Sequence, residues 1–83
     1  MGGDGHVRFT YSNPENYSGT INIFDFSMDK VIQLNNPHLV NNNESEVIWN
    51  GRNEYGDQVA NGVYFCRLSL NGKYYWTKLA VVN

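Results

Sequence analysis

The segment 49–65, WNGRNEYGDQVANGVYF, contains three glycines among several side chains that end in oxygen. Carboxylate and amide oxygens are the ligands that Ca²⁺ prefers, so the first chemistry to consider is a calcium loop. An EF-hand loop places Asp or Asn at five, three and one residues before its glycine, whereas Gly56 is preceded there by a glycine, Asn53 and a tyrosine. Because Gly and Asn tolerate left-handed backbone angles, the spacing favours tight turns between two strands. The side chains that could have supplied oxygen ligands to a calcium ion are Asn50, Asn53, Glu54 and Asp57.

The other reactive residue types lack the partners that catalysis needs. His6 lies at the start of the chain and His38 in a polar stretch, and neither has Cys, His or a carboxylate at ligand spacing. No serine stands in the Gly-x-Ser-x-Gly context of a nucleophile elbow. The eight carboxylates lie in polar segments that give no reason for a raised pKa. We therefore predict no catalytic, cofactor-binding or metal-binding residue, and a protein that is not an enzyme.

Cys66 is the only cysteine of the chain, which excludes an internal disulfide and any CxxC site. Alternation along its expected strand places the side chain on the inward face. We therefore predict a small buried apolar side chain and not a reactive thiol.

Three consecutive aromatic residues, Tyr74, Tyr75 and Trp76, lie in one expected strand. Because side chains alternate along a strand, at least one of them must face solvent. Such a surface could stack on sugar rings or pack against a protein partner. The alternative is that Trp76 covers the outer sheet face as a cross-strand partner of Phe65. Candidate surface contacts are thus Tyr75, Trp76 and Lys78.

The composition indicates a single folded domain. The chain has 83 residues and 14% aromatic residues, more than a disordered segment carries. Its net charge is −2 with six scattered basic residues, so we predict no nucleic-acid partner. The sequence contains no run of about eighteen apolar residues, so we predict no membrane span. Residues 1–5 are interpreted as an artificial start or linker, and residues 6–83 as the domain.

Short β-branched and aromatic runs bounded by Gly, Asn, Asp and Pro predict an all-β fold. Helical spacing is nowhere sustained. Asn71-Gly72 supplies the two positive-φ positions of a tight type I′ hairpin turn. We expect a polar loop over 35–43 and a possible short seventh strand at 57–60. The six main strands are expected at 6–11, 19–26, 30–34, 45–50, 62–70 and 73–82.

Two sheets packed face to face bury one side of every strand. Trp49 should lie near the middle of the core. The residues expected to point inward are Phe9, Ile21, Ile23, Val31, Leu34, Val47, Trp49, Val59, Tyr64, Cys66, Leu68, Leu79 and Val81.

The segment 49–65 also carries a family resemblance. Its pattern Trp-Asn-Gly-Arg-Asn, Gly three residues on, then Gly-Val-Tyr is similar to a signature of the immunoglobulin-like domain of flagellar hook-cap proteins. The carboxy-terminal domains of Bacteroidetes-type secreted proteins share that signature. Asn13-Pro14 before GTINIFDFSMDKV resembles the family's first hairpin and YYWTKLAVV its closing strand, so the resemblance covers about 7–82. The signature residues are Trp49, Gly51, Gly56, Gly62 and Tyr64.

The resemblance implies an immunoglobulin-like antiparallel β-sandwich of about seven strands at the carboxyl end of a longer protein. It implies a non-catalytic module, extracellular or on the surface of a Gram-negative bacterium after crossing the periplasm. Its partners would be the type IX secretion machinery or upstream domains of the same chain, for sorting or attachment. Where such domains commonly end in a basic doublet, this chain has the single Lys78, so a structural or spacer module stays open. Two other functions stay open: a carbohydrate-binding module using Trp76, Tyr75 or Tyr55, and an assembly module like that of the hook cap.

Overall fold

The computed structural model describes residues 7–35, 38–41 and 43–82, so His6 lies outside the described residues. The described residues form strands and turns without a helix, and none of their segments is a helix that could cross a membrane. The strands are β1 (Val7–Ser12), β2 (Gly19–Phe24), β3 (Lys30–Leu34), β4 (His38–Asn41), β5 (Glu44–Trp49), β6 (Gly62–Leu70) and β7 (Lys73–Val81).

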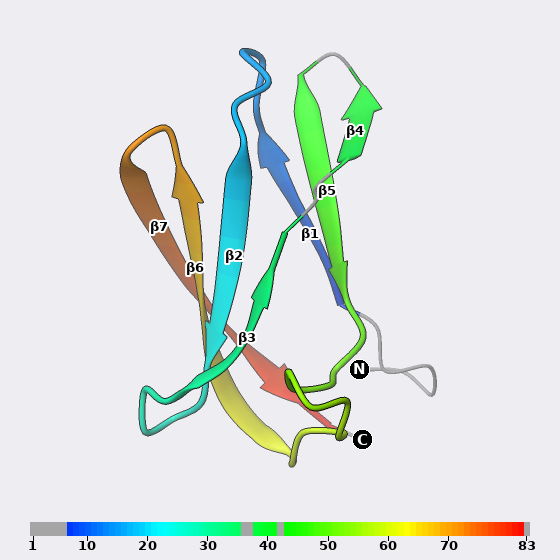
Figure 1. Ribbon diagram of the computed structural model, residues 1–83, viewed down its shortest axis with the longest axis vertical. Helices are drawn as coiled ribbons and strands as arrows, with labels where there is room; N and C mark the ends of the chain where they lie inside the picture. Colours follow the sequence, from blue (N-terminus) through cyan, green and yellow to red (C-terminus); the bar gives the residue numbers. More distant parts are fainter. Residues whose placement is uncertain (1–6, 36–37, 42, 83) are drawn as a thin grey trace.

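The strands form two antiparallel sheets, which lie as two layers in Figure 1. One sheet has the order β1-β5-β4 and the other the order β3-β2-β6-β7. The chain changes sheet between β1 and β2, between β3 and β4, and between β5 and β6. The predicted all-β, antiparallel class is confirmed, and the two sheets are consistent with a β-sandwich.

Two hairpins follow from local turn chemistry. The β6–β7 turn has φ of 50° at Asn71 and 75° at Gly72, the two positive angles that a type I′ turn requires. In the β2–β3 turn the Asp25 carboxylate accepts backbone N–H bonds from Ser27 and Asp29, both at 2.9 Å. Both predicted hairpins are confirmed, because β2 pairs with β3 and β6 with β7.

Two predictions of secondary structure are wrong. The segment 35–43, predicted as a loop, contains β4, which pairs with β5 in the register His38↔Glu46. His38 therefore lies in a strand. No strand forms at 57–60, where the only pairing is an isolated bridge between Arg52 and Gln58. Strand formation depends on the neighbour that a segment meets in the fold, and propensity does not reveal that neighbour.

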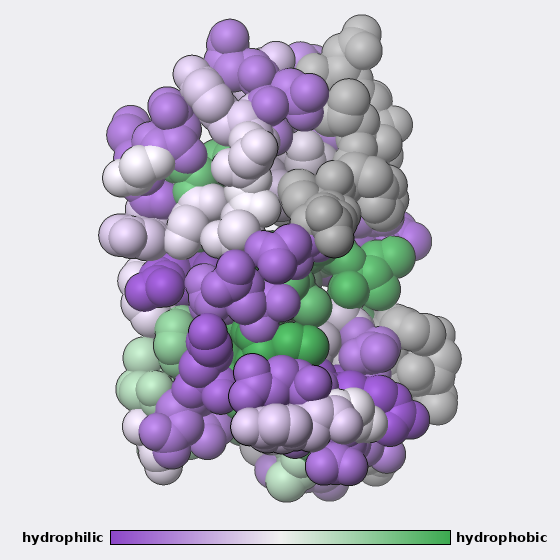
Figure 2. All heavy atoms as spheres, in the orientation of Figure 1, coloured by the Kyte–Doolittle hydropathy of each residue, from purple (hydrophilic) through white to green (hydrophobic). Residues whose placement is uncertain are grey.

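The core lies between the sheets, and every residue predicted to point inward is buried or partly buried there. Trp49 is fully buried and its ring meets Tyr64 edge to face, with centroids 5.9 Å apart. Val7 and Ile32 join the core although they were not among the residues expected to point inward. Ile32 follows strand alternation, because it lies opposite the buried Ile23. The residue that departs from alternation is its neighbour Val31, which the register shift between Ile23 and Phe24 leaves without an opposite residue and lets turn partly inward. The face seen in Figure 2 is mostly hydrophilic or intermediate, with hydrophobic residues gathered across its middle.

Candidate functional site

The turn segment 49–65 directs its amide oxygens at its own backbone. Asn53 Oδ1 accepts the N–H groups of Tyr55 at 2.9 Å and Asp57 at 3.0 Å. Asn50 Oδ1 accepts the N–H of Arg52 at 3.1 Å. These Asx bonds engage two of the four candidate oxygen donors, Asn50 and Asn53, in closing the turns. Within the described residues there is no group of three His, Cys, Asp or Glu able to hold a metal ion.

Positive φ angles at two glycines form the tight turns of the segment 49–65. Gly51 has a φ of 77° and Gly56 a φ of 86°, a conformation that costs a side-chain-bearing residue energy. Arg52 Nη1 donates to the Gly56 carbonyl at 2.9 Å. The third signature glycine, Gly62, is the first residue of β6. The glycines thus stand where the chain reverses between β5 and β6.

The two buried aromatic residues of the signature hold the turn segment against the core. Trp49 Nε1 donates to the Arg52 carbonyl at 2.9 Å. Tyr64 OH donates to the Ala60 carbonyl at 2.6 Å. Burial, followed by the nearby charge of Asp25, raises the pKa of Tyr64 above its ordinary value, so the phenol stays a hydrogen-bond donor.

A buried asparagine that the sequence analysis did not single out organises the β1–β2 connection. Asn13 is only 2% exposed. Its Nδ2 donates to the Tyr17 carbonyl at 2.9 Å and to Ser45 Oγ at 3.1 Å, and its Oδ1 accepts the Tyr17 N–H at 2.9 Å. Its backbone N–H continues the β1–β5 ladder to the Asn43 carbonyl at 2.6 Å. The signal that could have revealed it is the Asn-Pro step that ends the first strand.

The outer side of the four-stranded sheet carries an aromatic face, formed by Phe24, Phe26, Phe65, Arg67, Tyr74 and Trp76. The Arg67 guanidinium carbon lies 4.9 Å from the Tyr74 ring centroid, 5.4 Å from that of Phe24 and 5.7 Å from that of Trp76. Rings at this range attract the cation. Arg67 Nε is buried and meets no hydrogen-bond partner among the described residues. The three rings are thus the contacts on the buried side of this guanidinium, and they are drawn together around it.

The expected pair of Trp76 with Phe65 does not form. The β6–β7 register sets Trp76 opposite Arg67 and Phe65 opposite Lys78. The Trp76 ring instead meets Phe24, with centroids 5.7 Å apart. Trp76 nevertheless stays 52% exposed, so the aromatic face is open to solvent.

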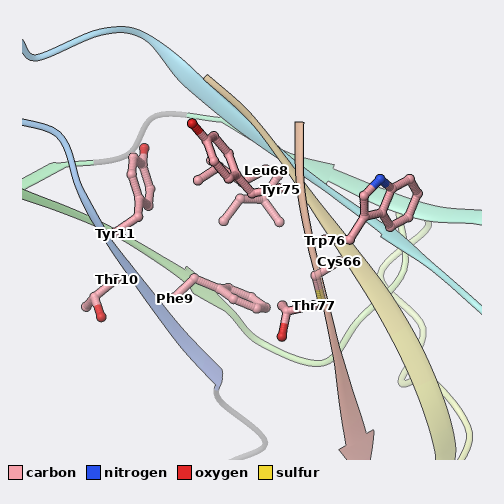
Figure 3. A pocket seen from close by; sticks show the side chains of 9 residues that line it. Phe9, Thr10, Tyr11, Cys66, Leu68, Tyr75, Trp76 and Thr77 are labelled. Atoms are coloured by element: carbon pink, nitrogen blue, oxygen red, sulfur yellow. The ribbon is translucent and has the colours of Figure 1, made fainter. Parts of the chain in front are cut away.

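The residues proposed for sugar binding do not share one surface. Figure 3 shows Tyr75 and Trp76 on opposite sides of β7. Tyr55 is 81% exposed on the turn segment between β5 and β6, apart from both. Lys78 is also exposed, on β7. The residue that shares the aromatic face with Trp76 is Tyr74.

A second surface feature is an apolar groove of about 140 Å³ between the edges of the two sheets (Figure 3). Phe9, Thr10 and Tyr11 of β1 line one wall. The other wall is formed by residues 75–77 of β7. The floor consists of core side chains, Ile21, Cys66 and Leu68.

Cys66 lies in this floor as a buried thiol, as its predicted inward position requires. Desolvation by burial raises its pKa from 9.0 to about 12. The thiolate is the nucleophilic form of cysteine. Cys66 therefore serves as a packing residue at neutral pH.

Comparison of the chain with protein-family models, with curated proteins and with solved structures gives no match. The resemblance to the hook-cap and secretion-domain family thus rests on the residues quoted above and stays a prediction.

Proposed function

We propose that this chain is a non-catalytic immunoglobulin-like β-sandwich module that acts through protein contacts. Its role is sorting or attachment at the carboxyl end of a secreted bacterial protein. The strand order supports the immunoglobulin-like type, because β1-β5-β4 and β3-β2-β6-β7 correspond to the orders B-E-D and C′-C-F-G of that fold. A tyrosine near the start of strand F that bonds to a carbonyl a few residues upstream is a hallmark of the fold, and Tyr64 makes this bond to Ala60.

The observation that carries an interaction role is the aromatic face. Phe26 is 74% exposed and Tyr74 and Trp76 are more than half exposed on one side of the sheet. Contiguous exposed apolar surface of this kind marks contact sites in soluble proteins. Arg67 holds three of the rings in place before any partner arrives, which lowers the ordering cost of association.

The test is a fusion of the whole 83-residue chain behind a reporter and a signal peptide in a cell with a type IX secretion system. We expect the reporter in the medium or on the cell surface. Replacing Tyr74 and Trp76 together by Ala should leave the reporter in the periplasm. The matched control is Tyr55→Ala, an exposed aromatic residue away from the aromatic face. Periplasmic retention of the unmodified fusion would refute the sorting role.

A carbohydrate-binding module is the second candidate, favoured by the same exposed rings. In such a module Tyr74 and Trp76 would stack on sugar faces. This pair replaces the set Trp76, Tyr75 and Tyr55 that the sequence suggested. Titration with soluble polysaccharides, followed by tryptophan fluorescence, tests it: Trp76 is the exposed indole and Trp49 the buried one. Saturable quenching that disappears in Trp76→Phe supports glycan binding, and an unchanged spectrum refutes it.

A further inference from the structure

The side of the four-stranded sheet that carries the aromatic face is also cationic. The register places Trp76 opposite Arg67 and Lys78 opposite Phe65. Because residues opposite each other project to the same side of a sheet, both cations lie on this side. β2, β3, β6 and β7 contain no Asp or Glu, although the whole chain has a net charge of −2. The positive charge is therefore a local property of this side.

Arg67 lies among the rings of the aromatic face without a counter-charge. Its cross-strand neighbours are Asn22 on β2 and Trp76 on β7. Its Nε is buried and meets no hydrogen-bond partner among the described residues. The acid that directly follows β2, Asp25, is held in the β2–β3 turn, where its Oδ1 accepts two backbone N–H groups. A guanidinium that is partly removed from water and lacks a carboxylate keeps donors for an external anion.

The guanidinium also selects the type of anion. Its planar fork of N–H donors matches the two oxygens of a carboxylate, which it can bind with two parallel hydrogen bonds. Lys78 follows Trp76 by two positions on β7, so it adds a second cation about 7 Å farther along the same side. The charges therefore favour a ligand that carries carboxylates at more than one point.

The remaining side chains around Arg67 indicate what carries those carboxylates. Tyr74 and Trp76 are 64% and 52% exposed, and both rings lie on this side of β7. Ser69 lies opposite Tyr74, and Thr20 lies opposite Ser69, so two hydroxyl groups belong to the same side. Flat rings gain dispersion energy against the C–H faces of sugar rings, and hydroxyl groups both donate and accept hydrogen bonds. Rings, hydroxyls and cations together fit an acidic sugar.

The dimensions of this side favour a narrow occupant. From Phe65 to Ser69 along β6 and from β2 to β7 across the strands it measures about 13 Å by about 10 Å, roughly 130 Å². A stable protein interface buries about 800 Å² on each partner, so a protein would have to cover much surface beyond it. β6 is paired on both edges, which leaves an extended peptide no ladder to join here. A few linked sugar rings match this area alone.

We propose that the aromatic face binds an acidic polysaccharide, a chain of linked uronic acid residues. Tyr74 and Trp76 stack on its sugar rings, and its carboxylates pair with Arg67 and Lys78. The proposal rests on the carbohydrate-binding candidate described above and names the class of glycan. A neutral glycan binds more weakly, because it offers hydroxyl groups in place of the carboxylate that the guanidinium lacks.

The probe is a hexamer of galacturonic acid, titrated into the full 83-residue chain and followed by tryptophan fluorescence and calorimetry. The matched neutral probe is a hexamer of galactose. We expect saturable binding of the acidic hexamer and at least about tenfold weaker binding of the neutral one, the loss of a charge-assisted hydrogen bond. Higher salt should weaken the binding of the acidic hexamer and leave that of the neutral hexamer unchanged.

Charge variants locate the site. Lys78→Glu replaces an exposed side chain and should weaken binding of the acidic hexamer about fivefold or more. Lys73→Glu is the matched control, because it changes the net charge equally from the other side of β7, and it should bind as the unmodified chain does. Equal losses in the two variants would reduce the effect to net charge and overturn the site. Arg67→Gln should bind the acidic and neutral hexamers alike, with folding checked by urea unfolding.

Three results with the unmodified chain would overturn the proposal. One is the absence of saturable binding of the acidic hexamer. Another is equal affinity for both hexamers, which would remove the acidic preference while leaving the carbohydrate-binding candidate standing if Trp76→Phe abolishes the quenching. The third is equally tight binding of a blocked hexamer of glutamate, which would identify the occupant as an acidic polypeptide. Export of the reporter is measured separately, and its failure would refute the sorting role without bearing on the glycan.

Discussion

The side chain of Asn13 should stabilise the fold out of proportion to its size. Asn13→Ala removes its three side-chain hydrogen bonds, two to Tyr17 and one to Ser45. At about 1 kcal/mol each, this loss lowers the free energy of unfolding by about 3 kcal/mol. A domain of 83 residues has a total stability of about 4 to 12 kcal/mol. The substitution should therefore remove a quarter or more of that stability.

Urea unfolding followed by tryptophan fluorescence measures this loss. Glu15→Ala, an exposed change in the same connection, is the control and should unfold within about 0.5 kcal/mol of the unmodified chain. A loss below about 1 kcal/mol in Asn13→Ala would refute the reasoning, since the three bonds would then be replaced by water at little cost.

Asn13→Asp gives the same prediction a pH dependence. The carboxyl group keeps the acceptor for the Tyr17 N–H but loses the amide donors, and burial disfavours its charged form. The folded-state pKa then lies above the unfolded one. Its contribution to stability is present below the unfolded pKa and is lost as pH rises through the folded one. Urea midpoints of this variant should thus approach those of the unmodified chain as pH is lowered from 7 toward 4, and a gap independent of pH would contradict a buried carboxylate.

Three further outcomes are expected. Tyr64→Phe, which removes the bond to Ala60, should lower stability by about 1 kcal/mol in urea unfolding. Trp49→Phe should cost more, about 2 kcal/mol or above, because it leaves a cavity as well as an unbonded Arg52 carbonyl, and equal losses would contradict this order. The raised pKa of Cys66 stabilises the fold below pH 9, and that contribution is lost as pH rises through about 12. The stability difference between the chain and Cys66→Ala should therefore shrink across that range in alkaline urea titrations.

Strand alternation identifies the core well. The pattern of apolar residues placed Trp49, Tyr64 and Cys66 inside, and all three are buried. Alternation fails at Val31, which is partly buried beside Ile32 because of a register shift between β2 and β3, and such a shift depends on a pairing that one strand cannot encode. Strand β4 escaped prediction for a related reason: an Asn-rich segment becomes a strand only through its partner β5.

The aromatic face and the groove were only partly predictable. Alternation required one exposed ring among residues 74–76, and the structure exposes all three. The position of Arg67 among the rings depends on the pairing of β2 with β6, two strands far apart in the chain. The groove depends on which strand edges lie on the same side of the two sheets. Neither arrangement has a local signal that a single sequence displays.

The pairing of β1 with β5 delays sheet formation in the nascent chain. Val7 lies opposite Trp49, 49 − 7 = 42 residues later. At synthesis rates of about 5–20 residues per second, β1 waits about 2–8 seconds on the ribosome before its own neighbour exists. During that interval its apolar side chains are exposed and can associate with other unfolded, aggregation-prone segments. Variants that weaken β5 should therefore lower the yield of soluble protein more than their effect on the finished fold implies.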